Sequence, residues 1–376
     1  MKVYLDNNAS TPLDPEVIKE MEPYIKKYYG NPSSGHWLGK KGKEAIETAR
    51  KQVADLIGAK PSEIIFTSGG SESNNHALKG IASEYKEKKG HIITSIIEHP
   101  SIINPCKYLE KEGFKVTYIG VDKYGKVNLE EIKDAITDKT ILISIMHANN
   151  ETGTIQPIAD IGKIARKKNI LFHTDAAQSV GKIPVNINEL NVDLLSIAGH
   201  KFHAPKGIGA LYIRAGVKLE SLIHGANHEM GKRAGTENVA GIVALGKASQ
   251  IVYKKMNEYN KEIERLRDLL HENLGKIAKI KLNGHPTGRL PNTLNLSFEG
   301  IDNTELVSKL KNIALSTGSA CHDNIKEPSA VLIAMNIPTE LALGAIRFSL
   351  GKFNTEEEIN YTIEEIKKII GGKNEA

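Results

Sequence analysis

The sequence predicts an α/β fold, in which a large and mostly parallel sheet domain is joined to a smaller α+β domain. Between about residues 60 and 215, short apolar runs alternate with segments of helical spacing, the pattern of strands and covering helices. After a long expected helix at about 240–275, strands and helices follow in a different order. The 376 residues exceed a typical single domain of about 100–200 residues. We therefore expect a large domain at 15–255 and a small one built from 1–14 and 256–376.

The elements of the large domain follow from their periodicity. The segment "GKEAIETARKQVADLIG" places Ala45, Ile46, Ala49, Val53 and Leu56 on one face and stops at Gly58, as an amphipathic helix does. A second helix is expected at 157–168, with its isoleucines on one face. Several apolar runs lack alternation, which is typical of strands buried on both faces. The expected strands are "EIIFTS", "HIITSI", "KVTYIGV", "TILISIM", "ILFHTD", "DLLSIAG" and "GALYIR".

The small domain is predicted from the segments that follow the long helix. A strand "NTLNLSF", a helix "TELVSKLKN", a loop around "STGSACHDNIKEPS", a strand "AIRFSL" and a final helix come in that order. The first 14 residues are expected to pack with them.

Composition excludes several classes of protein. The net charge of +5 comes from 50 basic and 45 acidic residues that are mixed along the chain, so the basic patch of a nucleic-acid-binding protein is missing. No apolar run approaches the about 18 residues of a membrane helix, and the first residues lack the apolar core of a signal peptide. Only two cysteines, Cys106 and Cys321, are present. We therefore expect a cytoplasmic protein with no disulfide framework.

Polar side chains follow five of the expected strands, where parallel sheets bind ligands. After "EIIF", the stretch "TSGGSESNN" offers glycines, hydroxyls and a helix start. This is either an anion-binding cup or an ordinary capped helix. It lacks the lysine of a nucleotide-binding loop, so a single phosphate fits it best. The other strands are followed by Glu98 and His99, by His147, Asn149 and Asn150, by Asp175 and Gln178, and by His200 and Lys201.

We compared two kinds of site for this set of residues, a metal site and a site for pyridoxal phosphate. A metal site is disfavoured, because Lys201 would place a cation beside the ion and no zinc motif is present. Asp175 alone could also be a helix cap. Pyridoxal phosphate uses the whole set: Lys201 supplies the amine that binds its aldehyde, and Asp175 pairs with its ring nitrogen. Gln178 would contact the ring hydroxyl and His99 would stack on the ring.

Eleven stretches in order along the chain resemble the cysteine desulfurases of the NifS/IscS type, which are class V aminotransferases of fold type I. They are "YLDNNAST", "GNPSSGH", "FTSGGSESNN", "EHPS", "HANNETG", "HTDAAQSVGK", "GHKFHAPKGIGALY", "HEMGKRAGTENV", "STGSACH", "EPSAVL" and "IRFSLG". The family often has a serine where this chain has Ala198, and a glycine-rich form where it has "GANHEMGKRAGTEN".

The resemblance implies a role for each matching residue. Catalysis would fall to Lys201, Cys321 and His99, and substrate binding to Asn150 and Arg347, with Arg347 gripping a carboxylate. Thr236 would reach the phosphate in a partner subunit, which implies a homodimer. Cofactor contacts would come from Gly70, Ser71, His99, Asn150, Asp175, Gln178, His200, Lys201 and Thr236.

The implied reaction is the removal of sulfur from L-cysteine. Freed Lys201 takes the Cα proton, the Cys321 thiolate attacks the substrate sulfur with help from His99, and alanine leaves. The persulfide on Cys321 would pass to an iron–sulfur scaffold or a tRNA-thiolation protein. Two alternatives stay open: a selenocysteine lyase, and a cofactor-bound partner or regulatory protein with little activity. We expect Cys106 to serve helix packing.

Overall fold

The computed structural model describes residues 1–317 and 327–371. The larger part of the chain contains α1 (Pro15–Lys26), α2 (Trp37–Ile57), β2 (Ile64–Thr67), α3 (Gly70–Glu84), β3 (His91–Ser95), α4 (Pro100–Lys111), β4 (Lys115–Ile119), α5 (Leu129–Ala135), β5 (Thr140–Ser144), α6 (Ile158–Lys167), β6 (Leu171–Asp175), α7 (Ile187–Leu190), β7 (Leu194–Ala198) and β8 (Gly209–Ile213). The 3₁₀ turns are η1 (Pro61–Glu63), η2 (Lys86–Lys88), η3 (Gly199–Lys201) and η4 (Glu229–Gly231).

Seven of these strands form one sheet in the order β2-β8-β7-β6-β5-β3-β4. Every neighbouring pair is parallel except the two made by β8, which runs antiparallel to β2 and to β7. The expected mostly parallel sheet is therefore confirmed. Because parallel strands end at the same edge, the residues that follow β3, β5, β6 and β7 are brought together there.

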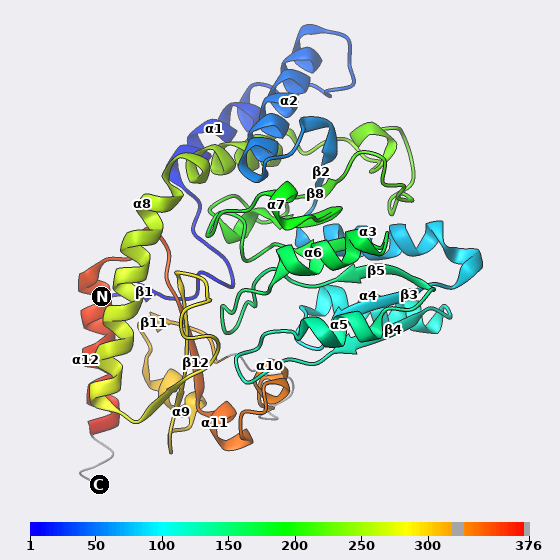
Figure 1. Ribbon diagram of the computed structural model, residues 1–376. Coiled ribbons are helices and arrows are strands. Elements are labelled where there is room, and N and C mark those ends of the chain that lie inside the picture. Colours follow the sequence, from blue (N-terminus) through cyan, green and yellow to red (C-terminus); the bar gives the residue numbers. More distant parts are fainter. Residues whose placement is uncertain (318–326, 372–376) are drawn as a thin grey trace.

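Two layers of helices cover the sheet (Figure 1). Successive strand residues point to opposite faces, so Ile93 and Ile143 join the cluster of α2, α6 and α8 (Val239–Ile277), whereas Ile92 and Leu142 join that of α3 and α4. This explains why the strands lack alternation: both faces need apolar side chains.

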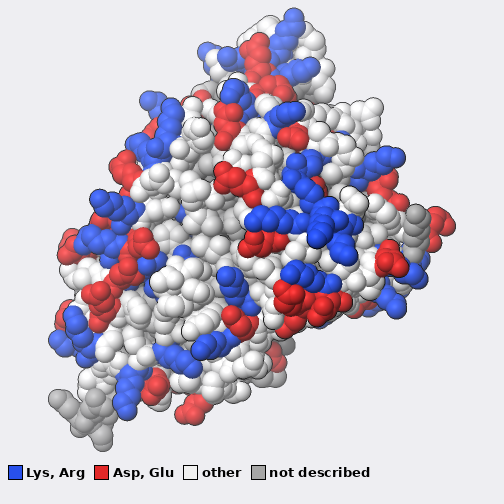
Figure 2. All heavy atoms as spheres, viewed as in Figure 1, with Lys and Arg blue, Asp and Glu red and all other residues white. Residues whose placement is uncertain are grey.

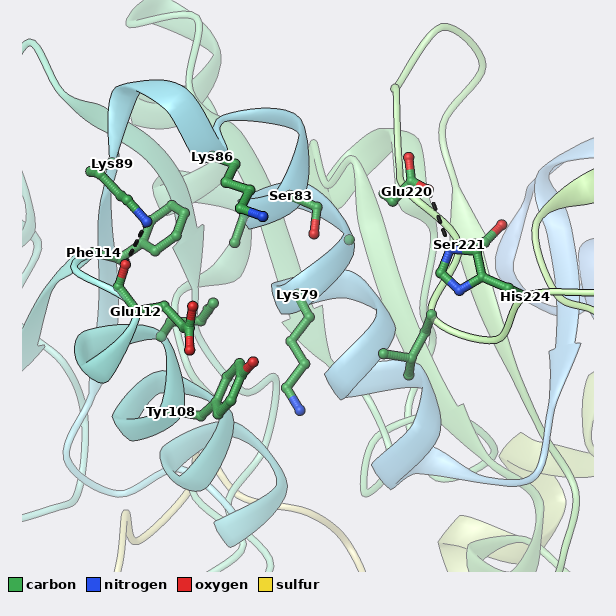
Figure 3. A pocket seen from close by; sticks show the side chains of 14 residues that line it. Lys79, Ser83, Lys86, Lys89, Tyr108, Glu112, Phe114, Glu220, Ser221 and His224 are labelled. Carbon is green, nitrogen blue, oxygen red and sulfur yellow. Dashed lines mark hydrogen bonds and ion pairs between the residues drawn. The ribbon is translucent and has the colours of Figure 1, made fainter.

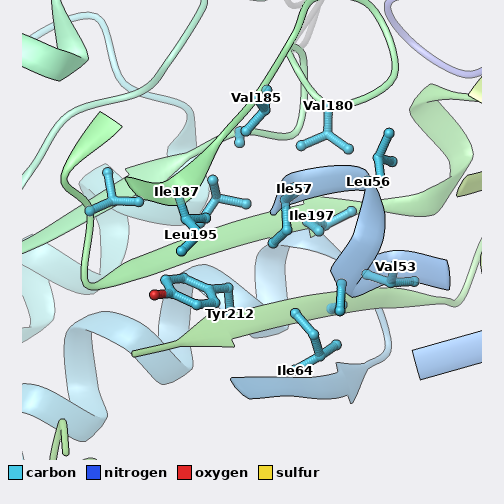
Figure 4. Close-up of a cluster of buried hydrophobic side chains, with 14 of the residues drawn as sticks. Val53, Leu56, Ile57, Ile64, Val180, Val185, Ile187, Leu195, Ile197 and Tyr212 are labelled. Atoms are coloured by element: carbon cyan, nitrogen blue, oxygen red, sulfur yellow. The ribbon is translucent and has the colours of Figure 1, made fainter. Parts of the chain in front are cut away.

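The cluster beneath α2 shows how the sequence pattern becomes packing (Figure 4). Val53 and Ile57 of α2 are fully buried and lie against Ile64 of β2 and Tyr212 of β8. Each such side chain contributes about 1.5–3 kcal/mol by leaving water. The helix ends at Gly58, whose φ of 70° is the left-handed conformation that glycine adopts most readily.

The long helix α8 (Val239–Ile277) runs from this cluster to a second one. The remaining elements are β1 (Val3–Tyr4), β9 (Ile280–Leu282), β10 (Thr293–Phe298), α9 (Asn303–Lys309), β11 (Ile313–Ala314), α10 (Ala330–Ala334), α11 (Thr339–Leu343), β12 (Ala345–Ser349) and α12 (Glu356–Gly371). The strands among them form an antiparallel sheet in the order β12-β10-β9 and a parallel pair of β1 and β11. Val3 and Leu5 are buried among the residues of this second cluster. The domain limits at 14/15 and 255/256 stay a prediction.

Basic and acidic side chains are interspersed on the face shown in Figure 2, in keeping with the mixed charge of the sequence. Within residues 1–317 and 327–371, none of the helices has the length and apolar character required to cross a membrane.

Candidate functional site

A cavity of about 430 Å³ lies at the carboxyl edge of the large sheet. Nine of the eleven predicted site residues line it: Gly70, Ser71, His99, Asn150, Asp175, Gln178, His200, Lys201 and Arg347. They come from the ends of several strands and, in the case of Arg347, from β12. Segments that are far apart in the sequence thus converge on one space.

Lys201 follows β7 and directs its side-chain nitrogen toward the N-terminal segment. Its Nζ donates to the main-chain oxygens of Asn8, at 2.7 Å, and of Ala9, at 3.0 Å. Burial, together with the charge of Arg347, lowers the pKa of Lys201 to about 8, against the opposing effects of Asp175 and Asp6. A fraction of this lysine is therefore neutral near pH 7 and able to act as a nucleophile or base.

Asp175 ends β6 with a buried carboxylate. Its Oδ2 accepts from Asn74 Nδ2 at 2.7 Å, and its Oδ1 accepts from the main-chain nitrogen of Ala177 at 2.9 Å. These two donors fix the orientation of the carboxyl group. The arrangement suits a partner for a protonated ring nitrogen.

His99 caps the N-terminus of α4 and is the end of a chain of hydrogen bonds. Its Nδ1 accepts from the main-chain nitrogen of Ser101 at 3.1 Å and lies 2.7 Å from Ser101 Oγ. That hydroxyl in turn accepts from Asn74 Nδ2 at 2.8 Å. Burial lowers the pKa of His99, and Lys201 lowers it further while Asp175 opposes both. Since Nδ1 is an acceptor, the neutral ring carries its proton on Nε2.

The start of α3 lies where the sequence predicts an anion-binding cup. Gly69 precedes the helix with a φ of 149° and offers no side-chain cap to its first N–H groups. A side chain at Gly70 would bring its Cβ within 3.3 Å of the Ala198 Cβ. The N-terminus of α3 borders the cavity through Gly70 and Ser71, so the positive end of the helix dipole lies beside this space, which suits an anion such as phosphate. His200 lies nearby, with Nδ1 3.3 Å from Ser10 Oγ.

Arg347 extends from β12 into the same cavity. One terminal nitrogen donates to Asp6 Oδ1 at 2.7 Å and the other to the main-chain oxygen of Asn150 at 3.0 Å. Its Nε is buried without a hydrogen-bond partner among the described residues. A guanidinium held in this way retains donor capacity for an incoming carboxylate.

Thr236 does not join the other nine residues. Thr236 borders a separate cavity beside Thr67 and Ser68 at the end of β2. Its segment is anchored by a buried ion pair, in which Arg50 Nη1 lies 2.7 Å from Glu229 Oε2. Cys321 lies outside the described residues.

Other residues in the cavity were not assigned from the sequence. Asn8, Ala9, Asn74 and Ser101 line it, and Asn74 bonds both Asp175 and Ser101. All four residues lie inside stretches quoted above. Their place in these stretches was therefore the one sequence feature that could have identified them as site residues.

Some of the residues at strand ends do not line the cavity. Glu98 is buried and accepts from Ser95 Oγ at 2.7 Å and from the Met146 main-chain nitrogen at 2.9 Å. His147 is also buried. No cluster of His, Cys, Asp and Glu within the described ranges is suited to a metal ion.

A second cavity, of about 270 Å³, lies between the C-terminal part of α3, α4 and the segment around 220 (Figure 3). Lys79, Lys86 and Lys89 border it together with Tyr108. None of the predicted site residues lines it, and Lys89 Nζ is bonded to the Glu112 main-chain oxygen at 2.6 Å. The larger cavity is therefore the candidate active site.

Comparison with known proteins agrees with this geometry. The class V aminotransferase family matches residues 3–362. The chain is 52% identical to a cysteine desulfurase IscS of Methanosarcina thermophila, over 98% of this chain and 92% of that protein. A NifS-like protein of known structure superposes with a TM-score of 0.93 and 43% identity, over 99% of this chain and all of the other. A structure of SspA in complex with cysteine has a TM-score of 0.84 and 39% identity, over 94% and 100% of the two chains. This chain therefore belongs to the class V aminotransferase family, in its group of NifS/IscS-type cysteine desulfurases.

Proposed function

We propose that this chain is a pyridoxal phosphate-dependent cysteine desulfurase, which converts L-cysteine to L-alanine and retains the sulfur as a persulfide on Cys321. The observation that carries the proposal is the convergence of Lys201, Asp175 and His99 on one cavity, beside a helix start whose N-cap, Gly69, has no side chain. The relatives named above, one of them solved with cysteine, support this substrate.

The residues of the cavity fit the cofactor. The N-terminus of α3 with Gly70, Ser71 and His200 would hold the phosphate, and Asp175 would pair with the ring nitrogen. Gln178 would bond the ring hydroxyl, and the neutral ring of His99 would stack. When bound, pyridoxal phosphate supplies an aldehyde for the substrate amine and an electron sink for the charge left at Cα.

The chain itself would bind the substrate and move its protons. Arg347 would hold the substrate carboxylate, with the main-chain oxygen of Asn150 fixing the guanidinium. Lys201, whose pKa of about 8 leaves part of it neutral near pH 7, would take the proton from Cα. The Cys321 thiolate would then attack the substrate sulfur: an S–S bond forms, the C–S bond breaks, and its electron pair stays with the product, which is protonated and leaves as alanine.

Two further parts of the proposal concern other molecules. Thr236 is exposed and lines a different cavity. This position supports a homodimer in which Thr236 binds the phosphate of the cofactor in the partner subunit. The persulfide would pass to an acceptor protein, either an iron–sulfur scaffold or a tRNA-thiolation protein.

Product analysis tests the reaction. With L-cysteine and a thiol reductant, the purified protein is expected to release alanine and sulfide in equal amounts, and Cys321→Ala to release neither. Cys106→Ala is the matched control, since Cys106 is buried in α4 and burial raises the pKa of its thiol to about 12. Desulfuration at the normal rate by Cys321→Ala would place the nucleophile elsewhere.

The same assay distinguishes the two alternative functions. Alanine formation only from selenocysteine, and independent of Cys321, would identify a selenocysteine lyase. Absence of alanine from either substrate, by protein that carries the cofactor, would identify a binding or regulatory protein.

A further inference from the structure

Lys182 is a buried lysine to which the proposed reaction gives no task. It follows β6, and only 7% of its surface is exposed. Its Nζ lies 2.6 Å from Gln178 Oε1 and 2.9 Å from Asn8 Oδ1. Its main-chain oxygen accepts from Asn260 of α8 at 2.6 Å. The amino group is thus held between two side-chain amides rather than beside a carboxylate.

Main-chain carbonyl groups determine which way each amide faces. Asn8 Nδ2 donates to the Asn150 main-chain oxygen at 3.1 Å, so the oxygen of that amide faces Lys182. Gln178 Nε2 donates to the Asn8 main-chain oxygen at 3.0 Å, so its Oε1 also faces Lys182. A carbonyl oxygen cannot donate, and therefore neither amide can be reversed without breaking one of these bonds.

Among the described residues, Gln178 is left with one unused donor. Its NH₂ group has two hydrogens, and the Asn8 main-chain oxygen takes one of them. Gln178 also lines the large cavity, whereas Lys182 does not. Lys182 is thus separated from the cavity by Gln178. It donates a hydrogen bond to the Gln178 amide oxygen, and the second N–H of that amide stays available to a ligand in the cavity.

Lys182 can serve in this way in either protonation state. Burial lowers its pKa well below the usual range, and the charges of Lys201 and Arg347 lower it further. The neutral amine has two N–H groups and the ammonium has three, so both forms can satisfy the two amide oxygens. A buried oxygen that lost this partner would be left without a hydrogen bond, which is unfavourable, and rotation of the Gln178 amide would relieve that cost.

We propose that Lys182 is a positioning residue, which holds the Gln178 amide with its free N–H directed into the cavity toward the ring hydroxyl of the cofactor. The inference rests on the proposed function, because it concerns the pyridoxal phosphate assigned there. Lys182 would thus influence the charge on the cofactor ring although it does not line the cavity.

The pH titration of the visible absorbance band of the holoprotein measures this effect. A hydrogen bond to the ring oxygen stabilises its anionic form and lowers the pKa observed for the coupled chromophore. Removal of a neutral hydrogen bond corresponds to a shift of about 0.5–1 pH unit. Lys182→Met and Gln178→Leu are each expected to raise the titration midpoint by this amount.

The double variant isolates the action through Gln178. If Lys182 acts by orienting that amide, adding Lys182→Met to Gln178→Leu shifts the midpoint by less than about 0.2 pH unit, well below the about 0.5–1 unit of the single variant. A shift of equal size in both backgrounds would overturn the proposal, because it would show an effect of charge alone. So would an unchanged midpoint in Lys182→Met.

A second buried lysine provides the control. Lys352 has a similarly buried side chain but pairs with Asp14, so Lys352→Met is expected to leave the midpoint unchanged. Cofactor content from absorbance and unfolding by circular dichroism confirm that each variant is folded and loaded. Failure of wild-type protein to take up pyridoxal phosphate would refute the proposed function, whereas a loaded protein without the expected pattern of shifts would refute the role of Lys182 alone.

Discussion

The main-chain oxygen of Asn8 accepts a hydrogen bond from the side-chain nitrogen of Lys201 at a distance of 2.7 Å. This contact joins the N-terminal segment to the end of β7, across 193 positions of sequence. The same oxygen accepts from Gln178. The N-terminal segment therefore forms part of the cavity wall, through Asn8 and Ala9, and it contacts the amino group of Lys201.

The lowered pKa of Lys201 predicts how cofactor uptake depends on pH. Only the neutral amine attacks an aldehyde, so the rate at which cofactor-free protein takes up pyridoxal phosphate should rise with pH and level off above about 8. Arg347→Gln removes a cation that lowers this pKa, and should move the midpoint upward. Stopped-flow absorbance measures the rate. A midpoint near the ordinary lysine value of 10.5 would contradict the effect of burial.

The hydrogen bonds to His99 predict the effect of Ser101→Ala. A hydroxyl that donates to Nδ1 favours the neutral ring, so its loss should raise the pKa of His99. The acid limb of the pH profile of kcat/KM should move upward accordingly, with little change in stability. Ser83→Ala, which alters the second cavity, should leave the profile unchanged. An unmoved acid limb in Ser101→Ala would show that this hydroxyl does not act on His99.

Glu98 predicts a stability that falls as the pH rises. Complete burial raises the pKa of its carboxyl group to about 8 from an ordinary 4.5. Between these values the folded chain binds more protons than the unfolded chain, so the free energy of unfolding decreases by up to about 1.4 kcal/mol per pH unit. The stabilisation is complete below pH 4.5 and is lost as the pH rises toward 8.

The variant Glu98→Gln tests this prediction. The amide has a similar shape and no proton to lose, so the stability of the variant relative to wild type should increase from pH 5 to pH 8. Urea unfolding at several pH values measures the difference. Parallel curves for the two proteins would mean that Glu98 does not titrate abnormally.

The buried pair of Arg50 and Glu229 predicts a large loss of stability in Glu229→Ala. The two side chains are joined by two hydrogen bonds, of 2.7 and 3.0 Å, and both are buried. Removal of the carboxylate leaves a buried cation, at a cost of about 3–5 kcal/mol. The exposed pair of Arg265 and Glu262 is the control, and Glu262→Ala should cost about 0–1 kcal/mol. Equal losses, measured by chemical denaturation, would contradict the prediction.

The sequence predicted those features that depend on local pattern and on the geometry of parallel sheets. Apolar runs without alternation identified the buried strands, and the shared edge of a parallel sheet placed His99, Asp175 and Lys201 together. The position of Arg347 in the same cavity came from the resemblance, because nothing local in "AIRFSL" distinguishes an arginine that points into a site.

Contacts across long stretches of sequence were not predicted. Asn8 bonds Lys182, Asn292 and Thr293 in the folded chain, and only packing of the two hydrophobic clusters brings these groups together. Lys182 stands in a loop sequence typical of an exposed lysine, yet it is buried. Its partners lie 4 and 174 positions away, and no periodicity or motif reports such a network.

Attachment of pyridoxal phosphate to Lys201 is the step on which the proposals for Asp175, Gln178 and Lys182 all depend. Reduction of the holoprotein with borohydride, followed by digestion and mass spectrometry of the peptides, locates that bond. We predict the mass of the reduced cofactor on Lys201 and on no other lysine. An unmodified Lys201 in protein that has retained the cofactor would contradict the assignment.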